Sequence, residues 1–504
     1  MSVADGVSRR AVLGAAALLA TPVRAREAAV ATAAGRFLGS REGGIAVFRG
    51  IRYGRAARFR PPVPEALPNQ RIEAMAFGPV APQASRQHPD QSEDCLFLNI
   101  WTPGADAARR PVMLYIHGGA YSNGSSTDPL NEGAALAAHG DVVVVTVNHR
   151  LNAFGYLYLA RLDPRFPDSG NAGQLDLVLA LQWVRANIAA FGGDSANVTV
   201  FGQSGGGAKI ATLMGMPAAT TLFHRAITMS GQQVTASGPL NATARARAFL
   251  ERLGRDPLTA PAESLVEALA ATDPVLGGSV YFGPVLDMRS LTRHPFWPDA
   301  NPQSNAIPML LGNTLAEARA FLPPGSPKLA RLSWDNLPAV MAPELRVDIS
   351  PEWVVAQYRA RHPDWSPRAV LWDAVTAGRS WRGQIEEAEA RAAAAAPTWV
   401  YQLDFADPAR LEAGAMHTMD IPLAFGTTAD PGAPSGNSPA ARTVSAAMMT
   451  AFTAFARSGT LPWPQYRTGP RTTMVFDTRS RVENDPRHWQ RELFARVPYV
   501  QQGT

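Results

Sequence analysis

The chain has 504 residues, of which 46% are hydrophobic and 18% charged, a globular composition with ample apolar material for a large core. Its formal net charge of +5 at pH 7 is small for this length, and no cluster of lysines and arginines suggests a nucleic-acid partner. The single cysteine, Cys95, excludes an intramolecular disulfide, and we interpret it as a buried structural thiol.

The amino terminus has the pattern of a targeting segment. Two arginines, Arg9 and Arg10, precede an apolar run from Ala11 to Ala20, and small residues follow as far as Ala25. This pattern resembles a twin-arginine export signal; an ordinary secretory signal and an unprocessed amphipathic start are the alternatives. We therefore predict a signal peptide over residues 1–25, cleavage after Ala25, and an exported protein that is periplasmic or secreted. The apolar run is too short for a stable membrane span, and we expect none elsewhere.

Between residues 110 and 230 the chain alternates strand-like and helix-like patterns. Short apolar or β-branched runs at 111–116, 142–147, 197–201 and 227–230 are typical of strands buried on both faces. Helical spacing of apolar residues covers 175–191, and a helical stretch follows at 208–214. This order predicts an α/β fold with a mostly parallel, doubly wound sheet that binds its ligand at the carboxyl ends of the strands.

The rest of the chain contains no clean linker, so we predict one domain over residues 26–504. The mixed segment 235–300 and the mainly helical segment 326–400 are expected to be large insertions that cover the active site. The Pro/Gly/Ser-rich segment 430–439 predicts an exposed loop.

A short motif marks the predicted nucleophile. Residues 202–206, GQSGG, fit G-x-S-x-G and stand between a predicted strand and a predicted helix, which places Ser204 on a tight turn. Upstream, Gly118 and Gly119 end the first strong strand in the run YIHGGAY. Such glycines expose backbone N–H groups that can stabilise an oxyanion in acyl transfer. The two motifs together indicate a serine hydrolase.

The chain resembles the type-B carboxylesterase/lipase family, which includes cholinesterases and bacterial para-nitrobenzyl esterases. Residues 191–206, FGGDSANVTVFGQSGG, are similar to the family's serine signature, and residues 92–100, SEDCLFLNI, to its second signature. Further similar blocks occur in order from Phe48 to Pro464. The resemblance therefore covers nearly the whole chain and implies an α/β-hydrolase fold with serine esterase activity.

The resemblance also implies the partners of Ser204, in the order serine, acid, histidine that this fold uses. His417, in GAMHTMDIP, matches the family's base. Glu317, in LGNTLAEA, matches its acid, although Ala318 replaces the usual trailing glycine. Asp420, three residues after His417, is the alternative acid.

Further site residues come from the same resemblance. The family's oxyanion hole corresponds to the backbone N–H groups of Gly119, Ala120 and Gly205. Ser230 resembles a family serine near the buried acid; it is either a hydrogen-bond partner of that acid or a plain residue at a strand end.

The pattern as a whole predicts hydrolysis of small-molecule carboxylic esters through a Ser-His-Glu triad and an acyl-enzyme, without a metal or another cofactor. Gln203 stands where many relatives carry glutamate, which weakens the case for a cationic substrate and favours uncharged esters. Amide or carbamate hydrolysis, acyl transfer, and a catalytically silent binding protein on the same fold are the alternatives. The natural ester and the oligomeric state stay open.

Overall fold

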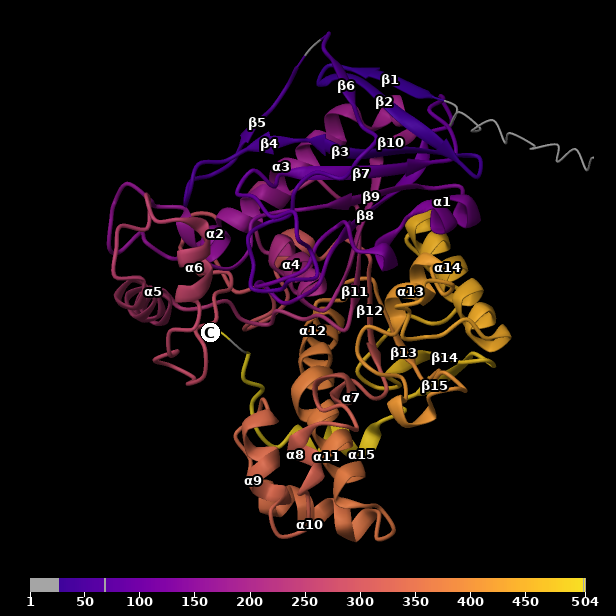
Figure 1. Cartoon of the computed structure of the whole chain (residues 1–504). Helices are drawn as coiled ribbons and strands as arrows, with labels where there is room; N and C mark the ends of the chain where they lie inside the picture. The colour runs from indigo at the N-terminus through magenta and orange to yellow at the C-terminus, as the bar shows by residue number, and fades with distance from the viewer. Residues whose placement is uncertain (1–26, 68, 502, 504) are drawn as a thin grey trace, which may run out of the picture.

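A large sheet forms the centre of the computed structural model, which describes residues 27–67, 69–501 and 503 (Figure 1). The predicted signal peptide lies outside these residues. The strands are β1 (Ala28–Thr32), β2 (Gly35–Glu42), β3 (Ile45–Arg52), β4 (Gly54–Arg55), β5 (Val63–Pro64), β6 (Arg71–Glu73), β7 (Phe97–Thr102), β8 (Arg110–Ile116), β9 (Val143–Val147), β10 (Gly193–Gln203), β11 (Arg225–Met229), β12 (Met309–Thr314), β13 (Thr398–Leu403), β14 (Thr472–Phe476) and β15 (Arg481–Asn484).

The middle of this sheet is parallel and its edges are antiparallel. The strand order is β1-β2-β3-β7-β9-β8-β10-β11-β12-β13-β14-β15, with β6 beside β2 and a separate pair formed by β4 and β5. Every pairing from β9 to β14 along this order is parallel, whereas β7 pairs with β9, and β15 with β14, in the antiparallel sense. The predicted α/β architecture with a mostly parallel sheet is thus confirmed.

Helices cover both faces of the sheet. They are α1 (Ala134–Gly140), α2 (Asn152–Tyr156), α3 (Ala172–Asn187), α4 (Gly205–Met214), α5 (Pro239–Leu253), α6 (Ala262–Ala268), α7 (Ala318–Phe321), α8 (Pro327–Ala330), α9 (Leu337–Met341), α10 (Pro351–Arg361), α11 (Pro367–Val375), α12 (Arg382–Ala393), α13 (Asp420–Phe425), α14 (Pro439–Ser458) and α15 (His488–Phe494).

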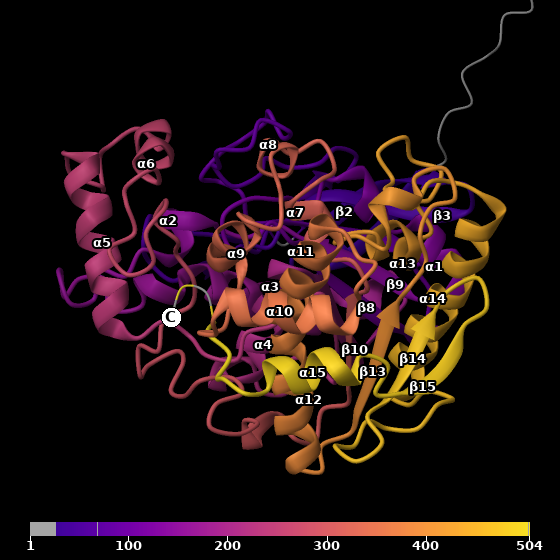
Figure 2. The same cartoon turned by 90° about the horizontal axis from the view of Figure 1, so that it is seen from below.

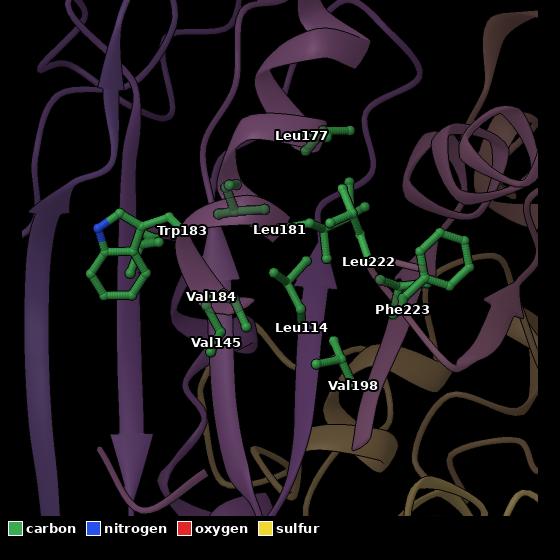
Figure 3. Packing of buried hydrophobic residues seen from close by; sticks show 14 of the residues in the cluster. Leu114, Val145, Leu177, Leu181, Trp183, Val184, Val198, Leu222 and Phe223 are labelled. Carbon is green, nitrogen blue, oxygen red and sulfur yellow. The ribbon is translucent and has the colours of Figure 1, made fainter. Parts of the chain in front are cut away.

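The core follows from the alternation of side chains along the strands. In β8, Leu114 belongs to the cluster beneath α3, whereas Met113 and Tyr115 belong to the cluster on the opposite face, beneath α14. Figure 3 shows Leu177, Leu181 and Val184 of α3 above the strand residues Leu114, Val145 and Val198. Because both faces are covered, these strands are apolar at nearly every position, which explains their continuous sequence pattern.

The second insertion builds a core of its own. Its cluster joins residues of α9, α10 and α11 to Leu493 and Phe494 of the carboxyl-terminal helix α15. Figure 2 shows α15 lying beside this group of helices. A serine followed by a proline begins two of them: Ser350 accepts from the N–H of Trp353 at the start of α10, and Ser366 from that of Ala369 at the start of α11. This is a strong helix-start signal, because the serine caps the first turn and proline tolerates the first position.

The structure differs from two local predictions. The third predicted strand begins at Gly193, four residues before the apolar run, because Gly193 pairs with Arg110 of β8 and a register shift separates this pair from that of Val198. The segment 430–439 has no regular structure before α14, but it is not an exposed loop throughout. Ala433, Pro434 and Ser435 are buried, and Arg410 donates to the carbonyl oxygens of the first two.

Candidate active site

Ser204 lies on a sharp turn between β10 and α4, at the carboxyl end of the sheet. Its φ of 55° and ψ of −123° are unusual for a residue with a side chain. Its N–H donates to the carbonyl oxygen of Met229 at 2.7 Å, which ties the turn to the neighbouring strand. The turn needs glycine beside it: a Cβ added to Gly206 would lie 1.9 Å from the carbonyl oxygen of Ile116. The turn therefore presents the Ser204 hydroxyl above the strands.

The loop after β8 packs directly against this turn. Gly119 and Ala120 both have positive φ values, 80° and 54°, so the loop folds back on itself. A Cβ on Gly205 would lie 2.1 Å from the carbonyl oxygen of Ala120, which leaves no room for a side chain there. The three residues predicted to form the oxyanion hole are thus brought together beside Ser204.

A buried lysine, Lys209, holds this loop from below. Its ammonium group donates to the carbonyl oxygens of His117 and Ala120, at 3.1 and 2.8 Å. The side chain is fully buried, and this burial lowers the pKa of Lys209 to about 7. Carbonyls that point at the lysine cannot point at the substrate, so the contact orients the loop. Sequence reasoning missed this role, although a lysine among apolar helix residues, in a chain with only two lysines, was a usable signal.

Glu317 and His417 meet although they are 100 residues apart in the chain. The Nδ1 atom of His417 hydrogen-bonds to Oε2 of Glu317, which is completely buried. The other carboxylate oxygen accepts from Ser230 Oγ at 2.5 Å, from the N–H of Thr314 at 2.8 Å, and from the side chain of Asn313 at 3.2 Å. Burial alone would raise the pKa of Glu317, but His417 and the donors of Ser230 and Thr314 outweigh it and lower the pKa.

Asp420, the alternative acid, has a different hydrogen-bond partner, Tyr401. Its Oδ2 atom accepts a hydrogen bond from the Tyr401 hydroxyl at 3.3 Å. Burial, followed by the charge of Glu317, raises the pKa of Asp420 to about 7. The carboxylate in contact with Nδ1 of His417 is that of Glu317.

Gln203 contacts the opposite side of the imidazole. Its side-chain nitrogen lies 3.3 Å from Nε2 of His417. An amide N–H donor here fits an imidazole that carries its proton on Nδ1, toward Glu317, and leaves Nε2 as the acceptor. This is the tautomer that can accept a proton from a serine hydroxyl.

Ser204 and His417 line one cavity of about 460 Å³ together with Gly119, Ala120 and Gly205. Other parts of its wall come from remote segments: Tyr281 from the first insertion, Arg346 and Arg379 from the second, and Tyr499 and Gln501 from the carboxyl-terminal tail. No sequence motif marked these residues, because each reaches the cavity through the packing of its own segment. Both segments expected to be insertions thus contribute residues to this wall.

Two further observations hold for the described residues. No group of three or more His, Cys, Asp and Glu side chains is arranged to hold a metal ion. No helix of this part of the chain has the length and apolar character needed to cross a bilayer.

The similarities to known proteins extend over almost the whole chain. The carboxylesterase family model matches residues 26–493. The para-nitrobenzyl esterase of Bacillus subtilis (strain 168) is 33% identical over 495 residues, which cover 92% of this chain and 97% of that protein. The phenmedipham hydrolase of Pseudarthrobacter oxydans is 31% identical over 499 residues, 90% of this chain and 96% of that protein. The crystal structure of the Geobacillus stearothermophilus carboxylesterase EST55 at pH 6.2 aligns with a TM-score of 0.82 at 36% identity, and the match covers 92% of this chain and 99% of that chain.

Proposed function

The chain belongs to the carboxylesterase family and is a carboxylic ester hydrolase of the α/β-hydrolase fold, and we propose that Ser204, His417 and Glu317 perform its reaction. The observation that carries this proposal is the contact of Glu317 with Nδ1 of His417, in the cavity that Ser204 also lines. A serine hydroxyl is a weak nucleophile and needs a base beside it, and the base needs an acid that orients it.

In the first half of the proposed reaction, Nε2 of His417 takes the proton of Ser204 as the hydroxyl oxygen attacks the ester carbonyl carbon. The N–H groups of Gly119, Ala120 and Gly205 stabilise the oxyanion, and the carboxylate of Glu317 stabilises the imidazolium. The tetrahedral intermediate then collapses. His417 protonates the leaving alcohol, and the acyl group stays on Ser204.

Water completes the cycle by the same steps. His417 accepts a proton from water, the resulting hydroxide attacks the acyl carbonyl carbon, and the serine leaves with the proton returned by His417. Two residues support this machinery without touching the substrate in our proposal. Ser230 helps to hold Glu317 in place, and Lys209 holds the loop that carries Gly119 and Ala120.

A labelling experiment tests the assignment of the nucleophile. We expect an organophosphate to add one adduct to Ser204, seen by peptide mass spectrometry, and to stop the hydrolysis of p-nitrophenyl esters. Ser204→Ala should lower kcat by about 10⁴-fold or more. Ser122→Ala, which changes another serine of the same cavity, is the matched control and should stay within about tenfold of wild type. A folded protein that takes no adduct, or a Ser204→Ala variant with wild-type turnover, would overturn the proposal.

We also propose that the chain is exported and that residues 1–25 are removed. The support is the sequence pattern of Arg9 and Arg10 before the apolar run. The amino-terminal sequence of the native protein, recovered from cell fractions, tests this. Export through the twin-arginine route predicts that replacing both arginines by lysine keeps the uncleaved protein in the cytoplasm. Secretion that is unaffected by this change would instead favour an ordinary secretory signal.

A further inference from the structure

Two arginines of the second insertion line the cavity that contains Ser204. Arg346 precedes α10, and its carbonyl oxygen accepts from the N–H of Val500, so the carboxyl-terminal tail fixes its backbone. Arg379 lies in a π-helical segment, Thr376–Trp381, between α11 and α12. Arginines on a wall of the reaction cavity are unexpected for an enzyme that acts only on uncharged esters.

Arg379 is held close to the proposed base by one aromatic ring. Its guanidinium carbon lies 4.4 Å from the centre of the Phe321 ring. The same ring lies 4.9 Å from the His417 ring, centre to centre. Arg379 and His417 therefore contact the same ring, and the guanidinium carbon lies at most about 9 Å from the centre of the His417 ring. This is the range that a short second arm of a small ester can reach.

Among the described residues that line the cavity, none is Asp or Glu. The carboxylates of Glu344 and Glu317 act on Arg379 from outside the described cavity wall, where they oppose the lowering of its pKa. Glu344 does contact Arg379, at 2.9 Å, but its other oxygen accepts from Lys328 at 2.8 Å, so one carboxylate faces two cations. Glu387, buried behind Gln233, has its pKa raised to about 8 by burial and is mostly protonated at pH 7.

The two arginines also act on each other and on nearby hydroxyls. Burial, followed by the charge of Arg346, lowers the pKa of Arg379. Burial raises the pKa of Tyr281 to about 12, and both arginines oppose that rise, so the Tyr281 hydroxyl lies within their field. Tyr499 experiences the same opposing charges. Guanidinium and phenol donors that converge on a cavity whose described wall holds no carboxylate favour a bound anion, and guanidinium matches the planar geometry of a carboxylate.

We propose that the cavity binds esters that carry a free carboxylate, with the scissile carbonyl at Ser204 and the carboxylate at Arg346 and Arg379. Half-esters of short dicarboxylic acids are the simplest members of this class. This inference rests on the proposed role of Ser204. It replaces the expectation of uncharged substrates, which considered Gln203 without the remote arginines.

Matched ester pairs test the proposal on the whole protein. Monoethyl glutarate and ethyl pentanoate share their reacting ester and chain length, and only the first has a carboxylate, on the acyl side. Acetylated 4-hydroxybutanoate and butyl acetate form the corresponding pair for the alcohol side. We expect kcat/KM to be about tenfold or more higher for the charged member of at least one pair, because a charge-assisted hydrogen bond is lost with the other member. The pair that shows this preference identifies the side of the ester that faces the arginines.

Variants connect that preference to the arginines. Arg379→Gln and Arg346→Gln should each lower the ratio of charged to neutral kcat/KM by about tenfold, and Arg379→Lys should restore part of it. Arg331→Gln, an exposed arginine of the same insertion outside the cavity wall, is the matched control and should keep the wild-type ratio. Increasing ionic strength should reduce the preference of the wild type.

The inference fails if, in both pairs, the wild type has the same kcat/KM for the neutral member as for the charged member. It also fails if the arginine variants leave the ratio of charged to neutral kcat/KM unchanged. Either result leaves the proposed role of Ser204 intact, because neutral esters would still be hydrolysed. If the organophosphate forms no adduct on Ser204 and the protein hydrolyses neither charged nor neutral esters, the proposed mechanism is overturned, and this inference with it.

Discussion

Replacing Glu317 by glutamine tests the proposed triad at the contact that defines it. Oε1 accepts from three donors, those of Ser230, Thr314 and Asn313, so a glutamine must keep its carbonyl oxygen in that position. Its NH₂ group then faces Nδ1 of His417, where Glu317 now accepts. Nδ1 must then accept a hydrogen bond from this NH₂ group, so the imidazole carries its proton on Nε2. In this tautomer Nε2 cannot accept a proton from serine.

The expected loss of kcat has two causes, the missing negative charge of Glu317 and the wrong tautomer of His417. The attraction between an imidazolium and a carboxylate about 4 Å apart is about 4 kcal/mol at an effective dielectric constant of 20, which corresponds to about 10³ in rate. The wrong tautomer adds to this loss. We therefore expect Glu317→Gln to lower kcat by about 10³- to 10⁴-fold with little change in KM.

The assay is steady-state hydrolysis of a p-nitrophenyl ester, with circular dichroism to show that each variant is folded. Asp420→Asn is the matched control, because it changes the other buried carboxylate near His417. Since the pKa of Asp420 is raised to about 7, much of it is already neutral, and we expect a loss below about tenfold. A Glu317→Gln variant that retains a tenth of the wild-type kcat would refute this reasoning. So would an Asp420→Asn variant whose kcat falls as far as we expect for Glu317→Gln.

Three further predictions concern the surroundings of the triad. Lys209→Met removes both hydrogen bonds to the loop that carries Gly119 and Ala120 and should lower kcat by about 10- to 100-fold while KM changes little; a rise in KM at constant kcat would show that the lysine does not orient this loop. Ser230→Ala removes a donor that helps to keep the pKa of Glu317 low, so the acidic limb of the pH–rate profile should move to higher pH; an unmoved limb contradicts this. Glu387 has a pKa of about 8 in the folded protein against 4.5 as the ordinary value, so its contribution to stability is full below pH 4.5 and is lost as the pH rises to about 8. Glu387→Gln should therefore increase the free energy of unfolding at pH 8 more than at pH 5.5, on the order of a few kcal/mol, and urea unfolding at both pH values measures the difference.

Local sequence patterns were sufficient for the parts of the fold whose causes are local. The apolar runs of β8 and β9 predict buried parallel strands because side chains alternate between two covered faces. The G-x-S-x-G motif predicts the turn at Ser204 because glycines are needed within a few residues of it. The prediction of an exposed loop over 430–439 failed at 433–435, which are buried and give two carbonyl oxygens to Arg410, a contact that composition does not encode.

The chain by itself thus determined its class of fold, its family resemblance and the candidates Ser204, Glu317 and His417. Only the tertiary structure decided that Glu317 rather than Asp420 contacts His417, that Lys209 supports the loop of Gly119 and Ala120, and that Arg346 and Arg379 line the cavity. The physical reason is the range of the interactions. Backbone conformation and alternating burial are set by neighbours within one element, whereas these contacts join segments about a hundred residues apart, and their geometry depends on how all the intervening elements pack.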